Sequence, residues 1–596
     1  MKSLLLPIVF LFAGQYLAQV STQVILDVPG YGVLNGTNEN STYTERPFYA
    51  FRSVFYAEKP TPLNRFLPPV PKAPYPMDEI QQATNNNAGC PQLNATNEDC
   101  LSLNIFTPQL PFESDTLLPV MVWIHGGGFS LGHAFVYLPN RYMEHDIVLV
   151  AIQYRLGPLG FLSFDTDDVP GNAGIFDQIE ALRWVNKYIQ YFGGDPTQIT
   201  IVGQSAGSAS VSLLLLAPQA RGLFQRAIGE SGSVLADWAL DRDGRGKVAS
   251  LQIAEMAGCP LEPYQDLLTC VQNIDPLVLD RAYQDYAKAD RLNGGLGYSG
   301  SSPIIQVAGA QRIIESDPLE LFNSGNFATV PTMFGANKQE GTLVLGVLYN
   351  EYLAPNNLTE DEEFLTNELV PQLLVALHID DPTGELAAQL TEKYLGTAVL
   401  GNFTSMTPGL TDLCSVLHFK GPSYEMTKVA SQHNPNAFFY SFEYEGRNSF
   451  FTYFFAINPP PIPHGVSHSD ELIYLFIYPF PSTPPGLNNH ETEVSMKMLQ
   501  VWTNFVIYGN PTPEGCDETA SIYVSCGVPC HHFHWNARRG RRPNVLVPVS
   551  STVMPVDLFE KRHDDERASS SVNEPRADYR KTKREKTQSY FWQLIL

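Results

Sequence analysis

One short stretch limits strongly what this chain can fold into: Gly-Gln-Ser-Ala-Gly at residues 203–207. Residues 199–202 before it are Ile-Thr-Ile-Val, which predicts a buried strand, and the leucine-rich residues 208–216 after it predict a helix. A glycine on each side of the serine lets strand and helix approach closely and leaves Ser205 on strained backbone. This order of strand, sharp turn and helix is typical of a nucleophile elbow, so Ser205 is predicted to be a nucleophile.

The surrounding pattern predicts an α/β fold. The apolar runs at residues 120–124 and 147–152 favour buried parallel strands, and residues 173–192 favour a helix with one apolar stripe. Strands that alternate with helices indicate a parallel sheet with right-handed crossovers. The chain of 596 residues has no internal repeat, so we expect one large domain over residues 19–558.

The two ends of the sequence differ from this pattern. Residues 1–18 start with Met-Lys-Ser, continue with the apolar residues 4–13 and predict a cleaved signal peptide. No later run is long and apolar enough to span a membrane, so we expect a secreted, extracellular protein. Residues 559–586 are charged and rich in serine, which predicts a disordered segment, and residues 587–596 predict a short aromatic helix end.

Charge and cysteine content narrow the possible partners. The formal net charge of −24 argues against a nucleic-acid partner. Eight cysteines in an exported chain predict disulfides, with the local pairs Cys90–Cys100 and Cys259–Cys270. The cluster of Cys and His at residues 526–534 matches no zinc spacing well, so no metal is expected. Five sequons on polar, turn-like segments predict glycosylation: Asn35, Asn40, Asn94, Asn357 and Asn402.

A nucleophilic serine needs a base and an orienting carboxylate, which in this fold follow it along the chain in the order acid, then histidine. Glu340 follows the strand-like residues 331–335 in a turn and is the candidate acid. Residues 463–472 hold two candidate bases, His464 and His468, and position alone does not choose between them. The glycines at 126–128 and Ala206 offer backbone N–H groups for an oxyanion.

The blocks at residues 98–104, 123–129, 171–207 and 335–341 resemble those of type-B carboxylesterases, in the cholinesterase-like α/β-hydrolase family. The resemblance spans residues 25–510 and implies a mostly parallel central sheet with helices on both faces. It also implies a triad of Ser205, Glu340 and His468 that needs no cofactor. The oxyanion donors that it implies are Gly127, Gly128 and Ala206. It supports the two local disulfides and makes Cys414 half of a third, with its partner open among Cys516, Cys526 and Cys530.

Departures from the family pattern bear on the substrate. Gln204 stands where many members carry Glu, which is similar to juvenile hormone esterases. Residues 91–99, within the first disulfide loop, contain no aromatic residue for a quaternary ammonium, and residues 297–302 are mostly small. We therefore expect a small-molecule ester substrate, neutral rather than choline-based, and a monomer or homodimer. The alternative interpretation is a non-catalytic adhesion protein of the same fold. The presence of the serine, the acid, the histidine and the oxyanion glycines favours the enzyme.

Overall fold

The computed structural model describes residues 23–87, 89–93, 95–479, 486–513 and 524–526. Several sequence-based predictions lie outside these residues: the signal peptide, the segments at 559–586 and 587–596, Asn94, Cys516 and Cys530. Within the described residues, no helix has both the length and the apolar character needed to cross a membrane.

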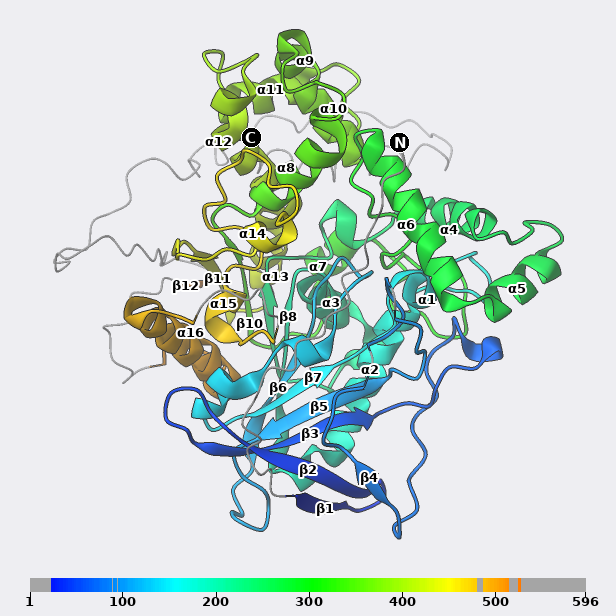
Figure 1. Ribbon diagram of the computed structural model, residues 1–596, viewed down its shortest axis with the longest axis vertical. Helices are drawn as coiled ribbons and strands as arrows, with labels where there is room; N and C mark the ends of the chain where they lie inside the picture. The colour runs from blue at the N-terminus through cyan, green and yellow to red at the C-terminus, as the bar shows by residue number, and fades with distance from the viewer. Residues whose placement is uncertain (1–22, 88, 94, 480–485, 514–523, 527–596) are drawn as a thin grey trace, which may run out of the picture.

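Within the described residues, twelve strands form one sheet in the order β1-β2-β3-β5-β7-β6-β8-β9-β10-β11-β12, with β4 paired to β2 (Figure 1). The strands are β1 (Val24–Val28), β2 (Gly32–Asn40), β3 (Pro47–Phe55), β4 (Ile80–Gln82), β5 (Ser102–Thr107), β6 (Leu118–Ile124), β7 (Val148–Ile152), β8 (Gly194–Gln204), β9 (Arg226–Glu230), β10 (Thr332–Asn337), β11 (Ala437–Phe442) and β12 (Val524–Cys526). The six strands from β7 to β11 along this order run parallel, whereas the two ends of the sheet are antiparallel. The predicted parallel strands β6 and β7 are confirmed, with Val122 opposite Val150.

Helices cover both faces of the parallel strands, as expected. The helices of the described residues are α1 (Gly157–Phe161), α2 (Ala173–Tyr188), α3 (Ala206–Leu216), α4 (Arg245–Met256), α5 (Tyr264–Asn273), α6 (Pro276–Leu292), α7 (Pro318–Asn323), α8 (Gly341–Leu348), α9 (Glu362–Asn367), α10 (Leu369–Ala376), α11 (Glu385–Tyr394), α12 (Phe403–Ser415), α13 (Gly421–Ser431), α14 (Phe451–Phe454), α15 (Leu472–Leu475) and α16 (Asn489–Tyr508). The predicted helix at residues 173–192 is α2, continued by a 3₁₀ turn at Ile189–Phe192.

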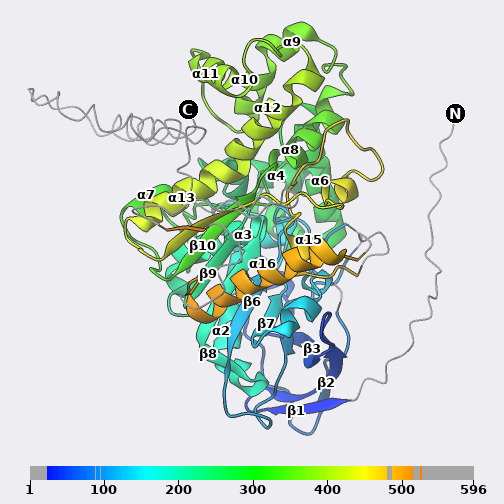
Figure 2. The same cartoon turned by 90° about the vertical axis from the view of Figure 1, so that its left-hand side faces the viewer.

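The residues of β6 show how the two layers arise. Val120 and Val122 pack into the core that contains α2 and α3, whereas Met121 and Trp123 pack into the core that contains α16. Side chains alternate across a strand, so a continuous apolar run buries both faces of the sheet. Figure 2 shows α16 crossing one face of these strands.

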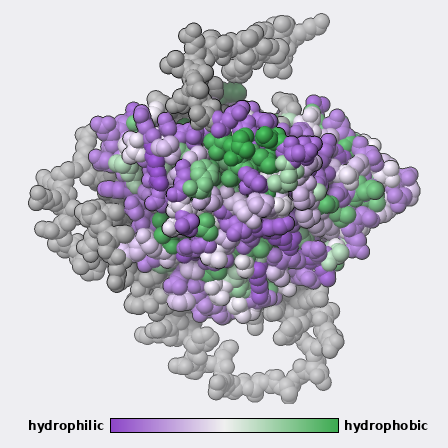
Figure 3. Space-filling model, turned by 90° about the horizontal axis from the view of Figure 1, so that it is seen from below, coloured by the Kyte–Doolittle hydropathy of each residue, from purple (hydrophilic) through white to green (hydrophobic). Residues whose placement is uncertain are grey.

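Two groups of helices extend the molecule away from the sheet. Helices α4 to α6 lie together, and α8 to α12 form a separate group at the top of Figure 1. The opposite end carries β1 and β4, where Ile25 and Ile80 are each about half exposed. Seen from below, most of the surface is hydrophilic, and a distinct hydrophobic patch interrupts it (Figure 3).

Candidate active site

Ser205 lies at the sharp turn between β8 and α3, as the elbow pattern predicts. Its backbone has φ 58° and ψ −123°, a conformation that non-glycine residues rarely adopt. A Cβ on Gly203 would lie 2.4 Å from the carbonyl carbon of Gly207, and one on Gly207 would lie 2.0 Å from the oxygen of Ile124. Backbone atoms cannot move aside like flexible side chains, so both positions require glycine.

His468 and Glu340 form a buried pair. The Nδ1 atom of His468 lies 2.6 Å from Oε2 of Glu340, and the two residues are 3% and 0% exposed. The other carboxylate oxygen accepts hydrogen bonds from the backbone N–H of Asn337, at 2.6 Å, and from the hydroxyl of Ser231. Because both oxygens have donors, the carboxylate is held in one orientation and fixes the imidazole ring.

The loop that carries His468 is bonded to the turn that carries Glu340. Gln339 and Val466 exchange two hydrogen bonds, of 2.8 and 2.9 Å, through the side chain and backbone of Gln339. The Asn337 amide donates to the oxygen of Ser467 at 2.8 Å. These contacts join segments more than 120 residues apart in the sequence.

His464 is placed differently. It is only half-buried, and its Nδ1 lies 2.8 Å from the oxygen of its own neighbour Gly465. Of the two candidates in this loop, His468 is therefore the one that reaches Glu340.

Gln204 also contacts His468, which the sequence did not predict. Its Nε2 donates to Ser469 Oγ at 2.9 Å and lies 3.3 Å from His468 Nε2. An amide N–H beside Nε2, together with the carboxylate beside Nδ1, favours the tautomer with a proton on Nδ1 and a free lone pair on Nε2. Within the described residues, no hydrogen bond joins Ser205 Oγ to His468. Catalytic hydrogen bonds often tighten only when substrate is bound.

The glycine loop after β6 packs against the nucleophile. A Cβ on Gly126 would lie 2.9 Å from that of Ser205, and one on Gly127 would lie 2.1 Å from the oxygen of Leu131. Gly127 and Gly128 have φ of 114° and 58°. Within the described part of the chain, the N–H groups of Gly127, Gly128 and Ala206 donate to no acceptor. Three unused donors beside a nucleophile can bind an oxyanion.

His125, just before these glycines, has a structural role. It is fully buried, and its ring stacks on Tyr154 with centroids 4.5 Å apart. Burial lowers the pKa of His125 to about 4, so the ring is neutral at physiological pH.

The two local disulfides are confirmed, with Cα separations of 5.0 Å for Cys90–Cys100 and 5.6 Å for Cys259–Cys270. The first of these loops packs on the glycine loop, because the amide of Gln92 both donates to and accepts from the backbone of Gly132 at 2.8 Å.

Cys414 forms no disulfide within the described residues. It is a free, buried thiol of α12, packed against Gly341 at the start of α8, and burial raises its pKa to about 12. Its candidate partners Cys516 and Cys530 lie outside the described residues, so the third disulfide implied by the resemblance stays a prediction.

For Asn35, the prediction of a glycosylated turn is wrong. Asn35 lies inside β2 rather than in a turn, is 3% exposed, and donates its amide hydrogen to Gln82 Oε1 at 2.9 Å. A buried, hydrogen-bonded amide leaves no room for a glycan, so Asn35 is removed from the candidates. Asn40, Asn357 and Asn402 are exposed and remain predictions.

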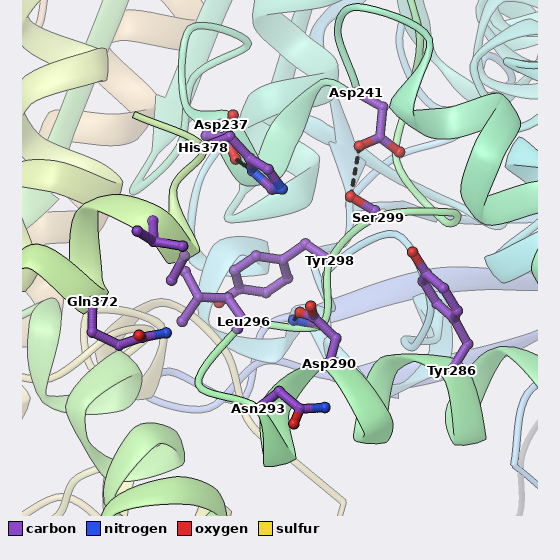
Figure 4. A pocket seen from close by; sticks show the side chains of 14 residues that line it. Asp237, Asp241, Tyr286, Asp290, Asn293, Leu296, Tyr298, Ser299, Gln372 and His378 are labelled. Atoms are coloured by element: carbon purple, nitrogen blue, oxygen red, sulfur yellow. Dashed lines mark hydrogen bonds and ion pairs between the residues drawn. The ribbon is translucent and has the colours of Figure 1, made fainter. Parts of the chain in front are cut away.

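A cavity of about 270 Å³ lies between α6, α10 and the loop at residues 295–299 (Figure 4). Tyr298 lines this cavity, and its ring contacts Trp238, with centroids 6.3 Å apart. Trp238 contacts Phe419, and Phe419 lies over His468 with centroids 4.5 Å apart. A continuous aromatic wall thus runs from the cavity to the catalytic loop.

The nearby aromatic run at residues 450–455 has a simpler role. Phe451 and Phe455 are buried in the main core, where Phe455 packs against Gly346 of α8.

The fold is that of an α/β-hydrolase, and comparison with known proteins gives the family and its activity on carboxylic esters. The family model of carboxylesterases matches residues 20–537, so the chain belongs to the carboxylesterase family. Juvenile hormone esterase of Tribolium castaneum is 33% identical over 546 residues, which cover 88% of this chain and 87% of that protein. Carboxylesterase 1D of Mus musculus is 33% identical over 492 residues, covering 79% and 83%.

A solved structure supports the fold. Juvenile hormone esterase from Manduca sexta, with OTFP covalently attached, superposes with a TM-score of 0.69 at 24% identity. The match covers 83% of this chain and 92% of that chain.

Proposed function

We propose that this carboxylic ester hydrolase works through an acyl-enzyme on Ser205. His468 Nε2 takes the proton from the Ser205 hydroxyl as its oxygen attacks the ester carbonyl. The N–H groups of Gly127, Gly128 and Ala206 stabilise the negative oxygen of the tetrahedral intermediate. His468 then gives the proton to the leaving alcohol, and water cleaves the acyl-enzyme by the same steps in reverse order.

The observation that carries this proposal is the 2.6 Å contact between His468 Nδ1 and Glu340 Oε2. The loop of His468 also contacts Gln204, the residue before Ser205. A carboxylate that holds Nδ1–H leaves Nε2 free to act as the base, and it stabilises the imidazolium that forms. Hydrolysis of aryl esters by the wild type and by a variant without the serine hydroxyl tests the assignment.

We also propose that the substrate is a neutral ester. The described residues of the first disulfide loop include no aromatic side chain, and Leu93 in that loop is 56% exposed. Gln204 places a neutral amide beside the nucleophile, where a carboxylate would attract a cation. Beside His468, Phe419 and Trp238 form a buried aromatic contact that carries no charge.

Acetylthiocholine is expected to be a poorer substrate than an uncharged thioester with the same acyl group. Desolvation of the quaternary ammonium without cation–π contacts costs free energy that the uncharged thioester does not lose, so we expect a deficit in kcat/KM of about tenfold. The measurement compares the two substrates with the same enzyme, and propionyl and butyryl pairs serve as controls for acyl size. A clear advantage for the choline ester at every acyl length contradicts the proposal.

Secretion is the remaining part of the proposal. Two disulfides in the described chain fit an oxidising compartment, and the sequence of residues 1–18 fits a signal peptide. The exposed sequons at Asn40, Asn357 and Asn402 would then be open to glycosylation.

A further inference from the structure

Two glutamates are completely buried close to the catalytic loop. Glu230 ends β9, and Glu471 directly precedes α15, three residues after His468. Neither side chain has exposed surface. Oε1 of Glu230 accepts a hydrogen bond from Trp502 Nε1 at 2.6 Å, and Oε2 of Glu471 accepts one from the Asn337 amide.

Each of these carboxyl groups keeps one oxygen without a partner. Oε2 of Glu230 and Oε1 of Glu471 are buried and accept no hydrogen bond, and the buried hydroxyls of Tyr142 and Tyr440 also lack a partner. Within the described residues, no lysine or arginine forms an ion pair with either glutamate. A buried carboxylate without a cation is very costly, so the usual response is to bind a proton.

The pKa shifts agree with this geometry. Burial raises the pKa of Glu230 to about 8. Burial also raises the pKa of Glu471 well above its ordinary value, and the nearby charges of Glu230 and Glu340 raise it further. The surroundings contain other acids but little positive charge. The titratable groups that face the pair or lie beside its segment are Tyr137, Tyr142, Tyr440, Tyr474, Tyr478, Glu340, Asp470 and His468. One buried cation lies beside the segment, Arg141, which donates to the backbone oxygens of Ile473 and Phe476.

We propose that Glu230 and Glu471 hold at least one proton between them at neutral pH and act as a positioning pair for the catalytic loop. A protonated carboxyl group is neutral, so its burial without a cation costs much less free energy than burial of a carboxylate. The inference rests on the proposed roles of His468 and Glu340. The pair itself touches neither the substrate nor the reacting atoms.

Asn337 connects this pair to the catalytic acid. Its backbone N–H donates to Glu340 Oε1, whereas its side-chain amide donates to Glu471 and to the oxygen of Ser467. If the pair loses its proton, the new negative charge acts on Asn337, and Asn337 holds both Glu340 and the loop of His468. While the pair is protonated, Glu340 is the carboxylate that determines the charge on His468.

The proton held by the pair should make the free energy of unfolding depend on pH. An ordinary glutamate in the unfolded chain loses its proton well below the folded-state pKa of about 8. The stability that the protonated pair contributes is therefore present at acidic pH and lost as the pH rises through about 8. Glu230→Gln keeps the shape of the side chain, supplies an N–H donor in place of the carboxyl O–H, and cannot ionise. Relative to this variant, the unfolding constant of the wild type should rise about tenfold per pH unit between about pH 6 and 8.

The test combines urea denaturation with kcat/KM across this pH range, for the wild type, Glu230→Gln and the second variant Glu471→Gln. Wild-type activity should fall above about pH 8, and either glutamine should move this decline upward by about one pH unit. Glu425→Gln is the matched control, because it neutralises a buried glutamate on α13 and should leave the decline in place.

If the free energy of unfolding changed with pH in the same way for the wild type and both variants, the proposal of a shared proton would be overturned. If the pH dependence of the free energy of unfolding differed between the proteins but the pH profile of kcat/KM did not move, only the positioning role would be overturned. Denaturation requires no catalysis, so failure of the Ser205 mechanism would appear separately, as a wild type without esterase activity.

Discussion

Ser205→Ala should lower kcat for ester hydrolysis by about 10⁴-fold or more, because no other group can form the acyl-enzyme. The fold should persist. Within the described residues the Ser205 hydroxyl makes no hydrogen bond, and alanine carries the same Cβ on the strained backbone. Initial rates with an aryl ester, together with the thermal unfolding midpoint, measure both effects.

Ser208→Ala is the matched control, because it removes a hydroxyl from the same helix. Ser208 is fully buried and donates to the oxygen of Gly232 at 2.7 Å, so its loss should cost about 1 kcal/mol of stability. Its activity should stay close to that of the wild type. Equal loss of activity in the two variants would indicate damage to α3 rather than loss of a nucleophile.

The second large effect separates the two histidines of one loop. His468→Ala should lower kcat by about 10⁴-fold, since the base and the partner of Glu340 disappear together. His464→Ala should change kcat by no more than about threefold, because the ring is half-buried and, among the described residues, forms a hydrogen bond only with its neighbour Gly465. Steady-state kinetics of the two purified variants at one pH make the comparison.

An inactive His464→Ala variant beside an active His468→Ala variant would mean that the wrong residue has been assigned as the base. Comparable losses in both would point to collapse of the loop, which thermal unfolding would reveal.

The elbow could be predicted because its signal is local. Ile-Thr-Ile-Val, two glycines and a leucine-rich run specify strand, turn and helix within about twenty residues, and β8 and α3 follow this pattern. The pairing of Glu340 with His468 is different. It depends on hydrogen bonds between segments 128 residues apart, and periodicity carries no information about such contacts. Position alone therefore left His464 and His468 equivalent.

Asn35 shows how a local signal can mislead. Asn-Gly is a strong turn signal, yet both residues lie inside β2. Gly36 is needed there for packing, because a Cβ would lie 2.7 Å from the ring of Phe51 and 2.8 Å from the oxygen of Ala50. Glu230 and Glu471 are a similar case. Acidic residues are usually solvated, and only the fold shows that these two are buried together.

The most direct test of the account is to label the protein with a fluorophosphonate and locate the adduct by peptide mass spectrometry. Such a probe reacts with a serine that is activated by its base and lies beside an oxyanion site. The account predicts one adduct per chain, on the peptide that contains Ser205, with loss of esterase activity in proportion to labelling. An adduct on another residue, or full esterase activity in a protein already labelled at Ser205, would contradict it.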